Sequence, residues 1–87
     1  MIVLVAYDIP ANRRRARVAK LLTSFGERVQ YSVFECHLTP ARYLELRECL
    51  VRLVQPRLDR VSFYPLCQAC FARAETIGPA YAETIEC

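Results

Sequence analysis

Several features are scarce or missing in this sequence, and each absence narrows what the chain can do. There is one histidine, His37, and one lysine, Lys20, and no apolar run approaches the length of a membrane span. No basic start or cleavage site precedes the first apolar segment, which argues against a signal peptide. Linkers, repeats and low-complexity stretches are also missing, so we expect one domain over residues 1–87.

The chain is small but rich in apolar residues. A domain of 87 residues buries only about 60–70% of the surface that its unfolded chain exposes, so its own core is thin. Hydrophobic residues nevertheless make up 54% of the sequence. Packing the surplus apolar surface against a second copy is one solution, and we therefore expect a homodimer.

The five cysteines are an odd number, and they favour a reduced cytoplasmic protein with free thiols. Cys67 and Cys70 have the spacing of half a zinc site or of a redox pair, but the two further ligands of a structural zinc site could come only from another copy. A redox role would need a helix to begin directly after Cys67. Residues 67–70 instead predict a turn and residues 71–77 a strand, so we expect ordinary half-buried thiols.

The hydrophobic pattern predicts strands and helices in succession. Residues 2–6 are apolar throughout, as in a central strand that is covered on both faces. A helix is predicted over residues 12–25, with Asn12 as its N-cap and Gly26 as the glycine that ends it. Residues 28–38 predict one long strand whose apolar phase switches near its middle, which indicates a bulge or bend.

A second helix is predicted after the N-cap Thr39, with Pro40 in its first turn and Pro56 beyond its end, and residues 60–66 predict a further strand. We assign the order β-α-β-β-α-β, the split βαβ of a ferredoxin-like α+β domain, with a possible short extra strand over residues 81–87. Both helices of this fold cover one face of the sheet, so we expect the bare faces of two copies to pack face to face. An open α/β layer is the alternative, but two helices are too few to cover both faces.

Positive charge is concentrated in the first two thirds of the chain. Residues 11–60 contain eleven basic and five acidic residues, whereas residues 61–87 contain one base and three acids. Arg13, Arg17 and Lys20 lie within about a 60° sector of the predicted first helix. Cations in the first helical turn oppose the helix dipole, and nearby phosphate groups would reverse the sign of that interaction. An anionic polymer fits this face, and a solvated charged surface is the ordinary alternative.

Asp8 stands at the carboxyl end of the first predicted strand. Taken alone, it reads as the residue that starts the turn before Ile9 and Pro10. In a two-fold dimer two such carboxylates could meet, and a divalent cation would remove their mutual repulsion. Because Mg²⁺ binds one or two carboxylates together with water and phosphate oxygens, we expect Asp8 to bind Mg²⁺ or another divalent cation.

The segments VLVAYDIP, GERVQYSVFEC and RVSFYPLC resemble the CRISPR-associated protein two family, and the resemblance extends over residues 1–66. It implies a ferredoxin-like fold, a symmetric homodimer and divalent-metal binding at Asp8. The family docks its integrase through the C-terminal segment, so residues 78–87 are expected to be a dimer- or partner-docking tail, although residues 81–87 match the family poorly. With the helix cations added, the candidate catalytic residues are Asp8 and Tyr7, the metal ligand is Asp8, and the nucleic-acid-binding candidates are Arg13, Arg14, Arg17, Lys20, Arg28, Ser32 and Phe34.

The resemblance implies a role in CRISPR adaptation, the acquisition of spacers. Family members are described as metal-dependent nucleases on RNA or duplex DNA, and also as a non-catalytic bridge that holds DNA between integrase dimers. One candidate acid per chain, without a histidine near it in sequence, favours at most a slow Mg²⁺-dependent endonuclease, so DNA scaffolding ranks above hydrolysis. A purely non-catalytic scaffold and a stand-alone toxin-type ribonuclease are the alternatives. The expected partners are a second copy, the integrase and double-stranded DNA or single-stranded RNA, with no membrane.

Overall fold

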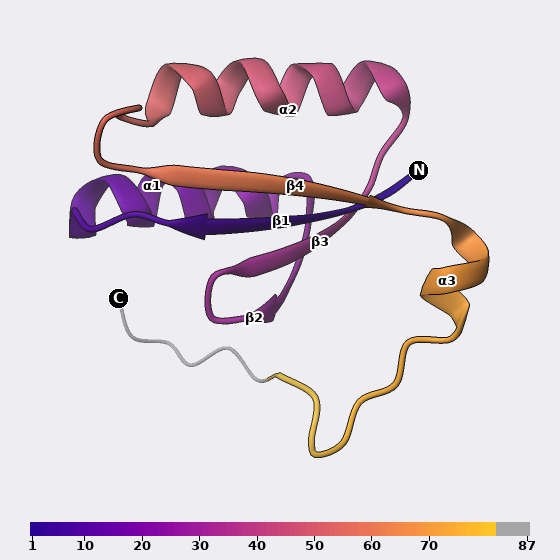
Figure 1. Ribbon diagram of the computed structural model, residues 1–87. Coiled ribbons are helices and arrows are strands. Elements are labelled where there is room, and N and C mark those ends of the chain that lie inside the picture. Colours follow the sequence, from indigo (N-terminus) through magenta and orange to yellow (C-terminus); the bar gives the residue numbers. More distant parts are fainter. Residues whose placement is uncertain (82–87) are drawn as a thin grey trace.

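The computed structural model describes residues 1–81. Within this range four strands, β1 (Ile2–Asp8), β2 (Gly26–Gln30), β3 (Val33–His37) and β4 (Arg60–Leu66), form one antiparallel sheet in the order β2-β3-β1-β4. The helices are α1 (Asn12–Thr23), α2 (Pro40–Leu53) and the short α3 (Gln68–Ala72). Both long helices lie on the same face of the sheet, and α3 follows the end of β4 (Figure 1). The predicted ferredoxin-like βαββαβ fold is confirmed.

Strand β1 occupies the interior of the sheet because it pairs with β3 on one side and β4 on the other. Its alternate residues Val3, Val5 and Tyr7 are buried beneath the helices. The intervening Leu4 and Ala6 point to the opposite face and are half-buried. This uncovered face, on which Leu4 pairs with the exposed Tyr64, is the one predicted to meet a second copy, and that pairing stays a prediction.

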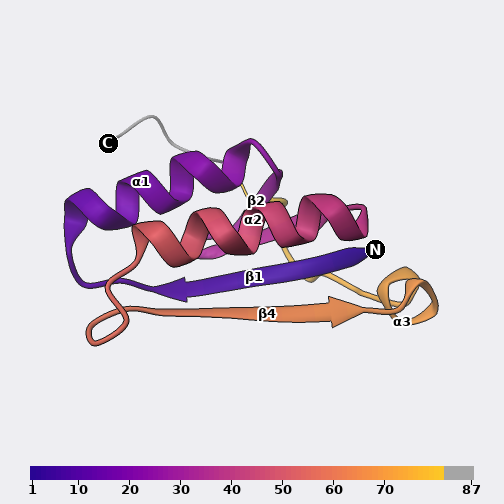
Figure 2. The same cartoon turned by 90° about the horizontal axis from the view of Figure 1, so that it is seen from above.

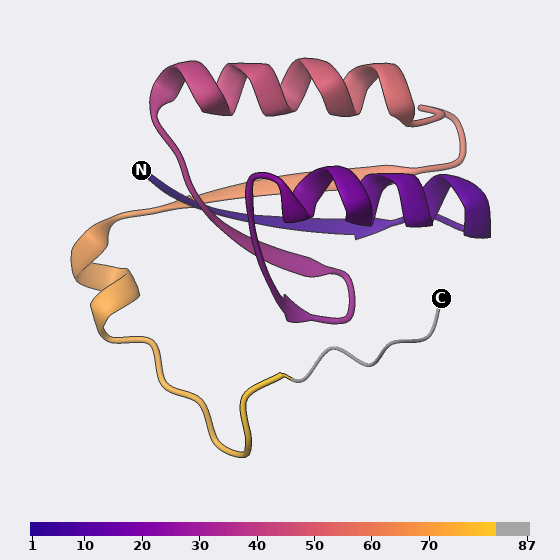
Figure 3. The same ribbon diagram turned by 180° about the vertical axis from the view of Figure 1, so that it is seen from behind.

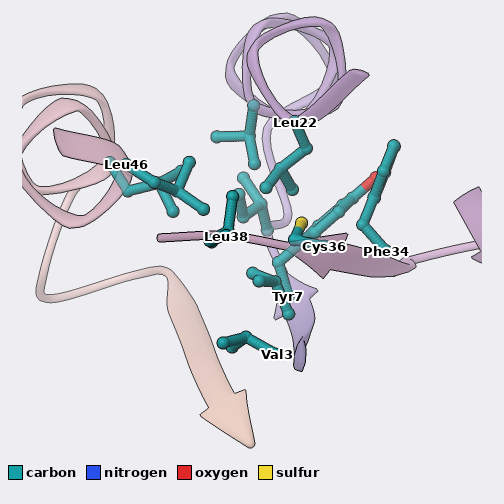
Figure 4. Close-up of a cluster of buried hydrophobic side chains, with 11 residues drawn as sticks. Val3, Tyr7, Leu22, Phe34, Cys36, Leu38 and Leu46 are labelled. Carbon is teal, nitrogen blue, oxygen red and sulfur yellow. The ribbon is translucent and has the colours of Figure 1, made fainter. Parts of the chain in front are cut away.

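A single hydrophobic core fills the space between the sheet and the two long helices. Seen from above, α1 and α2 run side by side over the strands (Figure 2). Leu22 of α1 and Leu46 of α2 point into the same buried cluster as Phe34 and Cys36 of β3 (Figure 4). All four side chains are fully buried. The apolar residues that recur at helical spacing in the sequence are therefore the ones that pack each helix on the sheet.

The long strand predicted over residues 28–38 is wrong, because the chain reverses at Tyr31 and Ser32 and forms the β2–β3 hairpin. The switch of apolar phase marks this turn, since each strand of a hairpin has its own alternation. The hairpin also contains a register shift between Arg28 and Gln30. These two short strands complete the βαββαβ order.

Two of the predicted helix ends also need correction. The N-cap of α1 is Ala11, and Asn12 begins the helix, where its side-chain oxygen accepts a hydrogen bond from Arg15. Gly26 does not end α1 but begins β2, and a Cβ at this position would lie 2.3 Å from the backbone oxygen of Glu35. The close approach of β2 to β3 therefore requires a glycine there. The Thr39 cap of α2 is confirmed, with a 3.1 Å hydrogen bond from the Arg42 amide.

The C-terminal part of the described chain differs most from expectation. The turn predicted over residues 67–70 and the strand predicted over residues 71–77 are wrong, because α3 begins at Gln68 and residues 73–81 contain neither helix nor strand. The cause is local: the Cys67 side chain caps the helix by accepting a hydrogen bond from the Cys70 amide. The possible strand over residues 81–87 lies almost wholly outside the described residues.

Candidate functional site

The carboxyl end of β1, the start of α1 and the β2–β3 turn lie at the same end of the molecule (Figures 1 and 3). A 3.1 Å hydrogen bond from the Tyr7 amide to the Ser32 carbonyl joins β1 to the turn. Arg15 closes the loop between β1 and α1, because its guanidinium donates to the Ile9 carbonyl at 2.7 Å. Three segments that are separate in sequence are thus held together around Asp8.

Asp8 is the last residue of β1, and its side chain is exposed. In the antiparallel register it stands opposite Arg60, the first residue of β4, which is also exposed. Ile9, which is only 2% exposed, anchors the chain directly after it. The carboxylate is therefore presented to solvent from a fixed backbone position, as a metal ligand or a phosphate-facing group would need.

A single chain supplies one exposed carboxylate, that of Asp8, at this end of β1 for binding a metal ion. Among residues 1–81 no cluster of three or more histidine, cysteine, aspartate or glutamate side chains could hold a metal ion. Mg²⁺ does not need such a cluster, because it keeps several waters and takes one or two carboxylates plus phosphate oxygens. One exposed Asp8 per chain fits that requirement when a second copy or a bound phosphate supplies further oxygens.

Tyr7 precedes Asp8 on β1, and its side chain points to the opposite face of the sheet, into the core, with 6% of its surface exposed. Its ring stacks on Phe34 with the centroids 6.3 Å apart. Burial raises the pKa of Tyr7 above its ordinary value of 10.0, while the positive charges of Arg28 and Arg15 oppose that shift. The phenol therefore stays protonated at neutral pH and can donate a hydrogen bond, but it is a poor general base.

Arg28 and Phe34 form a stacked pair at this end of the sheet. The Arg28 guanidinium lies 5.1 Å from the centroid of the Phe34 ring, within the range of a cation–π interaction. Phe34 itself is fully buried, so its ring cannot reach a nucleic acid. Phe34 instead packs against the Tyr7 ring and the Arg28 guanidinium. Ser32 is half-buried in the turn and contributes its carbonyl to Tyr7.

The basic residues of α1 divide into two groups. Arg13, Arg17 and Lys20 are all exposed and share one face of the helix. Arg14 and Arg15 turn inward to structural partners. Two of the three consecutive arginines of the first turn thus have a structural explanation that the sequence did not show. The predicted anion-binding face of α1 therefore consists of Arg13, Arg17 and Lys20.

Arg14 makes a bidentate ion pair with Asp59, with distances of 2.5 and 2.8 Å. Asp59 also accepts a 2.8 Å hydrogen bond from the Gln55 amide. The hydrogen bond to Arg14 lowers the pKa of Asp59, and the same bond raises the pKa of Arg14. This pair links the start of α1 to the loop between α2 and β4, so the Arg14 guanidinium already has a partner within the protein.

Sequence reasoning missed one residue at this end of the molecule. Arg60 faces Asp8 only through the pairing of β1 with β4, which no local pattern reveals. Tyr31, which the sequence marks with Phe34 as a candidate for base stacking, is 66% exposed at the tip of the β2–β3 turn, next to Ser32. The sequence feature that points to Tyr31 is the change of apolar phase that also marks the turn.

Comparison with known proteins gives a clear result. The family model described as CRISPR associated protein Cas2 matches residues 1–74 of this chain. The chain belongs to the Cas2 family. A Cas2 chain named a CRISPR-associated endoribonuclease, from Chlorobaculum tepidum, is 42% identical over 91 residues, which cover 99% of this chain and 95% of the relative.

Solved structures of the Cas2 family share the fold. The crystal structure of Streptococcus pyogenes Cas2 at pH 6.5 superimposes with a TM-score of 0.80 and 42% identity, covering 90% of this chain and all of the other. A chain of a partial Cas6-RT-Cas1–Cas2 complex superimposes with a TM-score of 0.73 and 28% identity, covering 87% of this chain and 89% of that one. Within residues 1–81, no helix is both long enough and apolar enough to cross a membrane.

Proposed function

We propose that this Cas2-family protein is a CRISPR adaptation protein that works as a homodimer, binds duplex DNA and bridges the CRISPR integrase. The observation that carries the proposal is the exposed cationic face of α1, formed by Arg13, Arg17 and Lys20. The helix starts at the same end of the molecule as the exposed carboxylate of Asp8 (Figure 1). Three cations on one helix face suit the regularly spaced phosphates of a duplex, and such contacts need no base recognition.

The uncovered face of the sheet supports the homodimer. Leu4, Ala6 and Val33 form its centre and are half-buried, and Tyr64 beside them is 54% exposed. A second copy packed on this face would bury them, and the dimer would carry six exposed α1 cations in place of three. The integrase as a partner is supported by the similarity to a chain of the Cas1–Cas2 complex.

Metal-dependent hydrolysis is the second candidate, because relatives of this chain are named endoribonucleases. Asp8 would hold Mg²⁺, which when bound would neutralise phosphate charge and lower the pKa of a bound water. Tyr7 is kept protonated by burial and would act as a neutral hydrogen-bond donor. Since Tyr7 is not a base, such hydrolysis would be slow, and we rank DNA scaffolding above it.

The two functions are separated by two variants. Asp8→Asn should abolish Mg²⁺-dependent cleavage and leave DNA binding and integration with the partner intact. Arg13→Glu combined with Arg17→Glu should abolish DNA capture and integration, and Arg52→Glu, on the exposed side of α2, is the matched control. Integration that survives the α1 charge reversal would refute the scaffold proposal, and cleavage that survives Asp8→Asn would refute the nuclease proposal.

A further inference from the structure

Cys67 and Cys70 lie at the opposite end of β1 from Asp8. Strand β4 runs antiparallel to β1, so Leu66, next to Cys67, pairs with Ile2, whereas Arg60 pairs with Asp8 (Figure 2). Both cysteines are free, and the prediction that they are half-buried is wrong, because both are exposed. They belong neither to the core nor to the nucleic-acid site, and the proposed function does not use them.

The two cysteines occupy the first turn of α3. Cys67 is the N-cap residue, and its sulfur accepts a hydrogen bond from the Cys70 amide at 3.3 Å. The Phe71 amide donates to the Cys67 carbonyl at 3.0 Å and closes the turn. A helix therefore begins directly after the first cysteine. A redox role for the pair requires such a helix, and the sequence had predicted a turn and a strand there instead.

This turn makes the two thiols unequal. The hydrogen bonds that Cys67 receives from the Cys70 amide and thiol lower the pKa of Cys67. The Cys70 thiol that donates to this sulfur has its own pKa raised. The negative charge therefore gathers on Cys67 and the proton stays on Cys70. A thiolate is the nucleophile in thiol chemistry, so Cys67 is the attacking sulfur and Cys70 the one that follows.

The other cysteines within residues 1–81 are less reactive toward a dissolved oxidant. Cys36 is fully buried in the core, and burial raises the pKa of its thiol to about 11. Cys49 is half-buried on α2. Reactivity toward a dissolved reagent follows thiolate character and exposure, so the first turn of α3 is the reactive place among the described residues.

We propose that Cys67 and Cys70 form a redox-active dithiol whose oxidant is a low-molecular-weight disulfide such as glutathione disulfide. The Cys67 thiolate attacks one sulfur of the oxidant, the oxidant's S–S bond breaks, and one thiolate leaves. Cys70 then loses its proton to solvent and attacks the Cys67 sulfur, which forms the Cys67–Cys70 bond and releases the second thiol. The protein gives up two electrons, and one disulfide is reduced to two thiols.

The fold allows this bond to form and to break. Residues three apart on a helical turn have their Cβ atoms about 5–6 Å apart, and a disulfide needs about 3.5–4.5 Å, so a small closure is enough. Helix α3 has no buried residue, and its Phe71 ring makes a T-shaped contact with the His37 ring, with the centroids 5.7 Å apart. A small movement of this turn therefore leaves the core undisturbed.

The test uses the full-length protein in defined mixtures of reduced glutathione and glutathione disulfide. Free thiols are blocked with iodoacetamide, and the protein is cleaved with trypsin and weighed by mass spectrometry. Cleavage after Arg60 and Arg73 places Cys67 and Cys70 alone in one peptide, residues 61–73, whereas Cys36, Cys49 and Cys87 fall in three others. We expect peptide 61–73 to lose two hydrogen atoms and to escape the blocking reagent.

Two single variants assign the roles. Cys70→Ser should trap the first step, so that glutathione stays attached to Cys67. Cys67→Ser should leave Cys70 mostly reduced and should react more slowly with iodoacetamide at neutral pH. The proposal is overturned if peptide 61–73 of the unaltered protein stays reduced under conditions that modify Cys87, or if Cys67 and Cys70 react equally in the two variants. Neither result bears on DNA binding, so the proposed function is tested separately.

Discussion

The exposed cations of α1 give a quantitative prediction about DNA binding. Replacing Arg13, Arg17 and Lys20 by glutamine removes three positive charges from each chain and six from the proposed dimer. Each phosphate that a protein neutralises on duplex DNA contributes about −0.9 to the slope of log K against log salt, so six contacts give a slope of about −5.4. Over a fourfold rise in salt, from about 50 to 200 mM, such a slope lowers the affinity by about 10³-fold.

The assay is fluorescence anisotropy of a labelled DNA duplex at a series of NaCl concentrations. The unaltered protein should show the steep slope, and the triple variant should bind weakly with a slope near zero. Arg52→Gln removes an exposed cation from α2 and should leave the slope unchanged within about one unit. A triple variant with the full slope would refute the assignment of the α1 face as the phosphate-binding surface, whatever other surface binds DNA.

Three further predictions concern the frame that holds this surface. Gly26→Ala should destabilise the fold by about 1–3 kcal/mol in urea unfolding, because its Cβ would meet the backbone of Glu35. Phe34→Ala should lower the free energy of unfolding by about 3–5 kcal/mol in the same measurement, because it removes a fully buried ring that packs against Tyr7. An exposed aromatic residue that only stacks on nucleic-acid bases would not have so large an effect on stability. Asp59 has a lowered pKa in the fold, so its stabilising contribution is present above its ordinary value of 3.8 and is lost as pH falls through the folded value. Asp59→Asn should therefore be less stable than the unaltered protein at neutral pH, and the difference should shrink on acidification.

Local sequence patterns were sufficient for the overall architecture. The apolar stripe of each helix and the uninterrupted apolar run of β1 predicted two helices packed on one sheet, because these periods follow from helix and strand geometry alone. The same periodicity placed Arg13, Arg17 and Lys20 on one exposed face. Asp8 at the end of β1 was also a local property, since it depends only on where the apolar run stops.

Local sequence patterns gave wrong predictions where the same residues are compatible with two different structures. The apolar phase change within residues 28–38 fits either a bulged strand or a hairpin, and the pairing of β2 with β3 decides between them. The sequence after Cys67 alternates like a strand, yet the hydrogen bond from the Cys70 amide to the Cys67 sulfur starts a helix. In both places a few hydrogen bonds outweigh a weak propensity.

The sequence by itself determined the fold class, the end of β1 at Asp8 and the exposed cationic stripe of α1, because each depends on residues within a turn or two of one another. Only the tertiary structure decided which arginines are available. Arg14 is occupied by Asp59, which lies 45 residues away, and Arg60 stands opposite Asp8 through the register of β1 and β4. The physical reason is that ion pairs and strand registers form between segments that meet only when the chain is folded, so no local period can encode them.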